Sequence, residues 1–248
     1  MRVGGPSATQ RGRDGASLAL ASAVIGHDGS LLVVARDAAS AHGATVTTWT
    51  ARTGTAPTQA TAGKRPFYDA RGGGGLTFDG VDDALVLADS LSAGNACTAV
   101  VVYTPTASAT AALLEFGATY YNTNGIGLFR DATGATITGT GSGTGGNYVQ
   151  STRLSPTGAT CALALIADRG TSPDSAQAVD HFGHIADAQV GVINTATNYA
   201  ANAGWIGARN NGASLPLAGR IHAVVVLRQA LTVGQTCALV AAALRVTA

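Results

Sequence analysis

Charged residues are scarce in this sequence. Asp, Glu, Lys and Arg together make up 12% of the 248 residues, and the formal net charge is +1. Lys64 is the only lysine, Glu115 is the only glutamate, and no run of like charge occurs. Proteins that bind nucleic acid or an anionic membrane gather positive charge on one face. We therefore expect neither nucleic acid nor a membrane as a partner.

Cysteine and long apolar runs are also lacking. Cys97, Cys161 and Cys237 form an odd set without a CxxC spacing, which excludes a complete disulfide framework, although one pair remains an alternative. Each lies among apolar or small residues, so we predict buried free thiols. No apolar run reaches the roughly 20 residues of a membrane-spanning helix.

The N-terminus has little apolar surface. Residues 1–15 are polar and rich in glycine, and they predict an extended arm. The apolar run 16–26 follows three arginines, which loosely imitates a secretory signal. Asp14 interrupts the basic region and the run is short, so an arm or an extra strand is the favoured interpretation.

A turn signal follows at Asp28-Gly29, between the apolar runs 16–26 and 30–39. Two apolar runs joined by Asp-Gly are typical of a hairpin, so we predict a pair of strands at the edge of the domain. We accordingly divide the chain into an N-terminal arm with edge strands (1–40) and a main domain (41–248).

Short apolar runs and glycine dominate what the sequence does contain. The 33 glycines supply turns, and threonine suits a pleated surface. Strands separated by turn signals at this spacing favour a sandwich or barrel. The only helix expected begins after Thr232, which can cap its N-terminus. The predicted strands cover residues 76–80, 84–90, 97–105, 112–118, 125–132, 136–143, 160–168, 188–194, 203–209 and 219–230.

Three segments carry a resemblance to a known family. They are VTTWTARTG…TQATAGKRPFY (46–68), LTFDGVDDALVLADSL (76–91) and GWIGARNNGASLPLAGRIHAVVVLRQALT (204–232). In this order the chain resembles the concanavalin-A-like (laminin-G-like) lectin/glucanase domains found in many phage and bacterial surface proteins. The resemblance implies an all-β fold, a two-sheet antiparallel jelly-roll sandwich, here with an extended N-terminal arm and one short C-terminal helix.

Most residues of these segments have structural explanations. The turn at 79–80 would let its flanking strands pair as neighbours, and the turn at 210–212 would do the same between WIGAR and SLPLAG. Trp49 and Trp205 are expected in the core rather than as ligand platforms. His222 alternates with apolar neighbours, which predicts a hydrogen-bonded histidine on the surface or in a groove.

An enzyme is not expected. The β-glucanases of the resembled family use two glutamates flanking an aspartate on one strand, whereas this chain has Glu115 alone. No GxSxG nucleophile elbow is present. His181 and His184 have a spacing that suits a metal, but a third convincing ligand is missing. We therefore predict a protein without catalytic residues.

One loop has the composition of a calcium site. Asp79, Asp82 and Asp83 are close together in the sequence, and clustered carboxylates suit Ca²⁺. The alternative is that Asp79 makes the turn while Asp82 or Asp83 binds local backbone amides. We favour this alternative, so no cofactor is expected.

A second loop has the composition of a sugar site. Tyr120, Tyr121, Asn122 and Asn124 combine aromatic faces with amide groups. The same residues also suit a plain exposed loop.

The resemblance favours a non-enzymatic structural component of a bacteriophage particle surface: a capsid decoration, head fibre or tail-associated protein. Residues 1–15 would then attach it to other virion proteins or to copies of itself, and host-surface glycans are additional candidate partners. The alternative is a carbohydrate-binding adhesion module of a bacterial surface or secreted protein, with an extracellular location. This functional expectation rests on family context, because a fold alone does not fix a function.

Overall fold

The computed structural model describes residues 30–37, 41–88, 91, 94–117, 124–141, 146–170, 175–180, 185–186 and 198–246. Within these ranges the strands form two antiparallel sheets. The larger sheet contains β1 (Leu31–Val34), β2 (Ala51–Thr53), β3 (Phe67–Asp69), β4 (Gly75–Asp79), β6 (Ala96–Pro105), β11 (Cys161–Asp168), β12 (Ser175–Asp180), β13 (Ile185–Ala186) and β15 (Ala218–Leu227). The smaller sheet contains β5 (Leu85–Leu87), β7 (Ala111–Phe116), β8 (Ile126–Arg130), β9 (Ala135–Gly141), β10 (Gly146–Leu154) and β14 (Gly204–Ile206).

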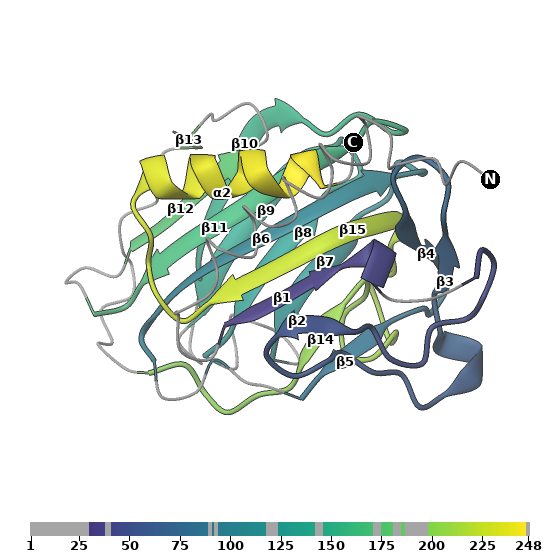
Figure 1. Cartoon of the computed structure of the whole chain (residues 1–248). Helices are drawn as coiled ribbons and strands as arrows, with labels where there is room; N and C mark the ends of the chain where they lie inside the picture. The colour runs from purple at the N-terminus through teal and green to yellow at the C-terminus, as the bar shows by residue number, and fades with distance from the viewer. Residues whose placement is uncertain are drawn as a thin grey trace, which may run out of the picture.

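The two sheets lie face to face and enclose the main core (Figure 1). The larger sheet has the order β13-β12-β11-β6-β15-β1-β2, with β4 also paired to β15 and β3 to β4, and the smaller has the order β10-β9-β8-β7-β14-β5. Trp49 is completely buried between them, and its indole nitrogen donates a hydrogen bond to the Val34 carbonyl at 3.0 Å. The predicted two-sheet antiparallel sandwich and the core position of Trp49 are confirmed.

The centre of the larger sheet is buried on both faces. In β6, Val101 faces the main core, whereas Val100 and Val102 belong to a second apolar cluster on the other side of the sheet. Strands covered on both faces read as continuous apolar runs because neither set of side chains meets water. This explains the unbroken AVVVY sequence of this strand.

The second cluster is closed by the helix α2 (Val233–Arg245), which covers the outer face of the larger sheet (Figure 1). The hydroxyl of Thr232 accepts from the Gln235 backbone N–H at 3.3 Å, and the Gln235 side chain accepts from the Thr232 N–H at 2.9 Å. This reciprocal capping box confirms the predicted helix start. No helix in the described ranges is long and apolar enough to cross a membrane. Two short 3₁₀ helices, η1 (Ala35–Asp37) and η2 (Ala62–Lys64), complete the described elements.

The expected alternation of β15 is wrong around His222. The pairing of β15 with β6 shifts register between Ile221 and Ala223, so Ile221 and Val224 both face the main core. A bulge of this kind inserts one extra residue, which the period of two cannot foresee. His222 is buried rather than on the surface; its ring contacts the Gly74 carbonyl at 2.6 Å and the Thr104 hydroxyl at 2.8 Å.

Two other pairing predictions are corrected. β4 and β5 do not pair as neighbours across the turn at 79–80, because β4 lies in the larger sheet and β5 in the smaller one. The strand expected in 30–39 is present as β1, but it is not an edge strand, since β15 and β2 occupy its two sides. The partner run 16–26 and the arm 1–15 lie outside the described residues, and the division at residue 40 stays a prediction.

Candidate functional site

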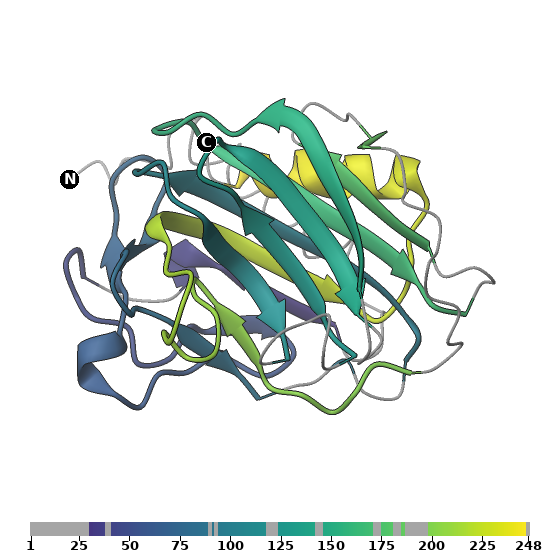
Figure 2. The same ribbon diagram turned by 180° about the vertical axis from the view of Figure 1, so that it is seen from behind.

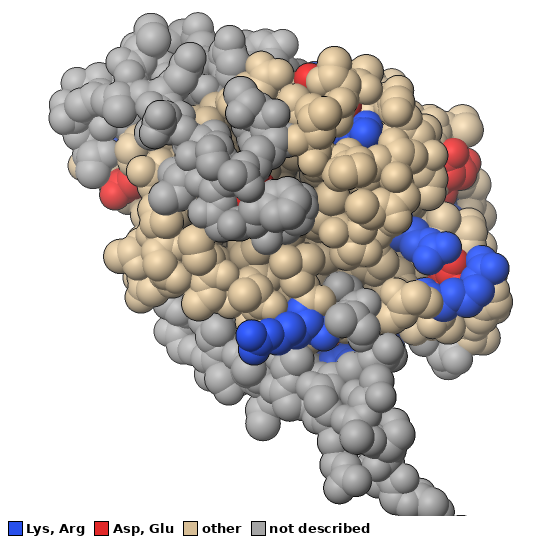
Figure 3. Space-filling view, turned by 90° about the horizontal axis from the view of Figure 1, so that it is seen from above, with Lys and Arg blue, Asp and Glu red and all other residues tan. Residues whose placement is uncertain are grey.

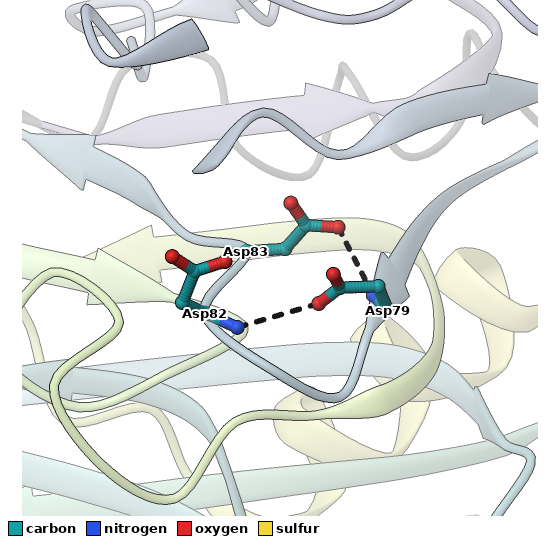
Figure 4. A group of neighbouring side chains, drawn as sticks. All are labelled: Asp79, Asp82 and Asp83. Carbon is teal, nitrogen blue, oxygen red and sulfur yellow. Dashed lines mark hydrogen bonds between the residues drawn. The ribbon is translucent and has the colours of Figure 1, made fainter. Parts of the chain in front are cut away.

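The three aspartates of the acidic loop, which was weighed as a calcium site, do converge. One carboxylate oxygen from each of Asp79, Asp82 and Asp83 lies within 4.8 Å of the others (Figure 4). The Asp79 carboxylate accepts from the backbone N–H groups of Val81 at 2.8 Å and Asp82 at 3.3 Å. Asp83 accepts from the Asp79 N–H at 3.0 Å. These are the local backbone hydrogen bonds that the metal-free alternative requires.

Asp83 is the most buried of the three and has an unusual protonation equilibrium. Burial, together with the negative charges of Asp79 and Asp82, raises its pKa to about 6. The Asp79 N–H opposes this shift only partly. The loop is therefore an acidic turn held by its own amides, and acidic groups of this kind are common on protein surfaces without an ion.

The candidate sugar loop lies between β7 and β8 in the sequence. Tyr120, Tyr121 and Asn122 lie outside the described residues, as do His181 and His184. Asn124 is described: it has a left-handed backbone (φ 54°), and its carbonyl accepts from the Ala200 N–H at 3.2 Å. The loop thus remains a predicted site, and only its last polar residue has a described environment.

The outer face of the smaller sheet carries a row of aromatic and polar residues. Figure 2 views the molecule from this side, with α2 behind. The strand register places Thr58, Val86, Trp205 and Glu115 in one row across the sheet edge, β5, β14 and β7. Gly204 and Ile206, on either side of Trp205, face the core. Because successive residues of a strand point to opposite faces, Trp205 and Glu115 point outward.

Glu115 is the strongest feature of this row. Its carboxylate accepts two hydrogen bonds from the Arg209 guanidinium, from Nε at 2.8 Å and from Nη2 at 3.0 Å. The Glu115 side chain is fully buried, whereas 20% of the Arg209 side chain is exposed. The guanidinium also lies over the Phe129 ring, 5.2 Å from its centre. Arg209 is thus fixed by a bidentate ion pair and by a cation–π contact.

The turn that follows Arg209 is fixed to the rest of the molecule. Asn210, Asn211 and Gly212 all have positive φ, and Arg209 pairs with Ser214 across them, so the predicted turn at 210–212 is confirmed. Asn211 accepts hydrogen bonds from Gln59 at 2.9 Å and from Lys64 at 2.8 Å. Arg209 is therefore presented by a turn with tertiary anchors.

The row becomes more exposed toward β5. Thr58 is exposed, Val86 and Trp205 are partly exposed, and Glu115 is buried beneath Arg209. We call Thr58, Val86, Trp205 and Arg209 the Trp205 surface. It offers an aromatic side chain, a hydroxyl and guanidinium N–H groups that Glu115 does not use. Such a set can stack on a flat apolar face and donate hydrogen bonds to oxygen atoms.

Sequence reasoning missed this surface because Trp205 was expected in the core. The pattern of AGWIGAR leaves the direction of the tryptophan open, since small and apolar residues flank it on both sides. The signal available was Glu115, a lone acid within the apolar run ALLEFG. A buried carboxylate needs a cation, and Arg209 follows a neighbouring strand.

Charged residues are sparse on the described part of the face seen from above. On this face, residues other than Lys, Arg, Asp and Glu make up most of the described part, and the charged residues form small separate groups, one of which mixes basic and acidic side chains (Figure 3). Acid and base are also paired beneath the surface: the carboxylate of the buried Asp69 lies 2.9 Å from Arg71 Nε and 2.8 Å from Arg220 Nη2.

Comparisons with known proteins identify relatives by fold alone. No family model matches the sequence, and no curated protein matches it. Solved structures do match. A heptameric SAP-like pentraxin from Limulus polyphemus has a TM-score of 0.52 at 15% identity, covering 66% of this chain and 80% of the pentraxin chain.

Two further matches are carbohydrate complexes. The CBM40 domain of the Ruminococcus gnavus IT-sialidase, bound to α2,3-sialyllactose, has a TM-score of 0.53 at 16% identity and covers 67% of this chain and 95% of that domain. Domain 4 of AbnA, a GH43 extracellular arabinanase from Geobacillus stearothermophilus, in complex with arabinotriose, has a TM-score of 0.52 at 17% identity and covers 71% and 81%. The chain therefore shares the fold of these structures, a concanavalin-A-like sandwich of two antiparallel sheets.

Proposed function

We propose that this chain is a non-catalytic carbohydrate-binding module and that the Trp205 surface is its sugar-binding site. The single observation that carries the proposal is an outward-facing tryptophan beside a guanidinium that Glu115 and Phe129 hold in place. The described residues place α2 over the other outer face, so the Trp205 surface lies on the opposite side of the sandwich.

The chemistry of a sugar suits these groups. One face of a pyranose or furanose ring presents C–H groups, which pack on the apolar face of an aromatic ring. The ring hydroxyls meanwhile accept hydrogen bonds from donors, here the remaining N–H groups of Arg209, which is held in place, and the exposed Thr58 hydroxyl. Fixing Arg209 in advance lowers the entropy that its side chain loses on binding.

The comparisons support this proposal over the virion role. The structures named above are a pentraxin and two domains solved with oligosaccharides, and none of them is a virion protein. The expected phage component has no support beyond the sequence resemblance, and its attachment arm lies outside the described residues. With this function we also propose a secreted or cell-surface location.

The state of Glu115 supports the absence of catalysis. General acid–base chemistry on a glycosidic bond uses two carboxyl groups within reach of the substrate. The only glutamate of the chain is buried, and both of its carboxylate oxygens accept hydrogen bonds from Arg209. A carboxylate bound in this way is unsuited to protonating a leaving group.

Replacement of Trp205 tests the proposal. We expect Trp205→Ala to weaken binding of an oligosaccharide, found by screening a glycan array, by about tenfold or more, which corresponds to about 1.4 kcal/mol. Isothermal titration calorimetry measures the change. Val81→Ser is the control, because Val81 is 70% exposed and lies in the acidic loop rather than on the Trp205 surface. Equal affinity in Trp205→Ala and wild type, with both folded by circular dichroism, would refute the site.

A further inference from the structure

The ion pair between Arg209 and Glu115 affects which sugars the Trp205 surface can bind. We infer that the Trp205 surface binds uncharged glycans in preference to acidic ones. This inference rests on the proposed function and deepens it by naming the class of ligand. Its basis is that the guanidinium of Arg209 is already neutralised by the fully buried carboxylate of Glu115.

The hydrogen-bond inventory of Arg209 comes first. A guanidinium has five N–H groups, and Glu115 takes one from Nε and one from Nη2. Three N–H groups remain as donors. They can donate hydrogen bonds to the hydroxyl oxygens of a sugar, which need a donor but no compensating charge. Arg209 therefore offers the directional hydrogen bonds of an arginine without its full attraction for anions.

The position of Glu115 sets the cost for an acidic sugar. A sugar carboxylate bound to the free edge of Arg209 would face the Glu115 carboxylate across a single planar group. Glu115 is inaccessible to water, so its negative charge is weakly screened. Two carboxylates would then share one cation, and their repulsion offsets most of the attraction that the guanidinium supplies.

The other exposed members of the row carry no charge. Thr58, Val86 and Trp205, which continue it across the sheet edge and β14, are uncharged. Phe129 on the other side of Arg209 contributes an aromatic face. Recognition by this surface would therefore depend on stacking and neutral hydrogen bonds, and these respond little to salt.

A matched pair of probes tests the inference. Lactose and α2,3-sialyllactose differ by one acidic sugar, and arabinotriose and trigalacturonate supply a second neutral and acidic comparison. Calorimetric titration of the full chain at about 20 and about 500 mM NaCl, on either side of physiological ionic strength, gives the affinities. We expect binding to at least one neutral probe, with less than a twofold change between the two salt concentrations, and no tighter binding of the acidic probes.

Three outcomes separate the two proposals. Acidic probes that bind at least tenfold tighter than neutral ones, with an affinity that falls in salt, would overturn the inference and leave the proposed function standing. Binding to none of these probes and to no member of a glycan array would overturn the proposed function, and the inference with it. Binding that Trp205→Ala leaves unchanged would place the ligand on another surface and overturn both.

A variant of the ion pair adds a second readout. Glu115→Gln leaves the Arg209 charge uncompensated, so we expect affinity for α2,3-sialyllactose to rise at least threefold at low salt while affinity for lactose changes less. The double variant Glu115→Gln/Arg209→Gln removes both charges together and is the control for folding and polarity; it should show no such rise. Equal affinity of the folded single variant and wild type for the acidic probe would contradict the inference.

Discussion

Asp69 and Asp83 carry the same side chain, and both are nearly inaccessible to solvent, yet their pKa values lie on opposite sides of the ordinary value. Hydrogen bonds from Arg71, with the nearby charge of Arg220, hold the pKa of Asp69 at about 2. Asp83 has burial and two acidic neighbours instead, and its pKa rises to about 6. For a buried carboxyl group, the charge of its neighbours therefore decides which form is favoured: basic neighbours favour the charged form of Asp69, and acidic neighbours favour the neutral form of Asp83.

The raised pKa of Asp83 predicts a specific dependence of stability on pH. Between about pH 4 and pH 6 the folded chain binds this proton more tightly than the unfolded chain, so the free energy of unfolding falls as pH rises through this range. We expect Asp83→Asn to remove this fall and to stabilise the protein at neutral pH by about 1 kcal/mol, with allowance for solvent screening. Thermal melts from about pH 4 to about pH 8 measure the effect.

Two other observations check that result. The amide introduced by Asp83→Asn would retain an oxygen that can accept from the Asp79 N–H, so the turn keeps its hydrogen bond. Asp69→Asn serves as the opposite case, because the lowered pKa of Asp69 contributes stability that is present from about pH 4 to about pH 8 and is lost only at lower pH, as pH falls through about 2. A pH profile of Asp83→Asn that overlays the wild-type profile would show that Asp83 titrates normally.

At the scale of elements, the helix was the easiest part of the fold to predict, because its start is encoded locally. Thr232 and Gln235 satisfy each other's backbone N–H groups, and the apolar side of α2 fits the outer face of the larger sheet. We expect Thr232→Ala to lower the free energy of unfolding by about 1 kcal/mol through loss of the cap. Chemical denaturation measures it, with Thr106→Ala, an exposed loop threonine, as the control.

The strands were predictable as segments but not as neighbours. A turn signal such as Asp79-Gly80 predicts that the chain reverses, and Gly80 does have positive φ. The signal does not predict in which sheet the next strand lies. The same limit applies to β1, whose partner β15 is distant in sequence. The bulge at His222 and the outward direction of Trp205 also depend on tertiary pairing, which is why the Trp205 surface emerged only from the structure.

At the scale of the whole molecule, the described core draws on residues from Leu31 onward. Residues 1–15 are polar and rich in glycine, a composition from which we expect little apolar burial. We expect a chain without residues 1–15 to remain folded, with a melting temperature within about 2 °C of wild type and unchanged glycan affinity. The sequence-based expectation adds that such a chain would no longer join an assembly, which size-exclusion chromatography with light scattering can follow. Aggregation or loss of cooperative melting in the truncated chain would show that residues 1–15 are needed for a stable fold.

The placement of α2 determines how the protein can be immobilised on a sensor chip. The helix covers the outer face of the larger sheet, and the Trp205 surface belongs to the other sheet. A biotin or fluorescent tag joined beyond α2 would therefore sit on the reverse of the sandwich, and on a sensor chip the tryptophan side would point into the flowing sample. A tag inserted beside Thr58 would shield that side, so two otherwise identical chips would differ in signal by orientation alone.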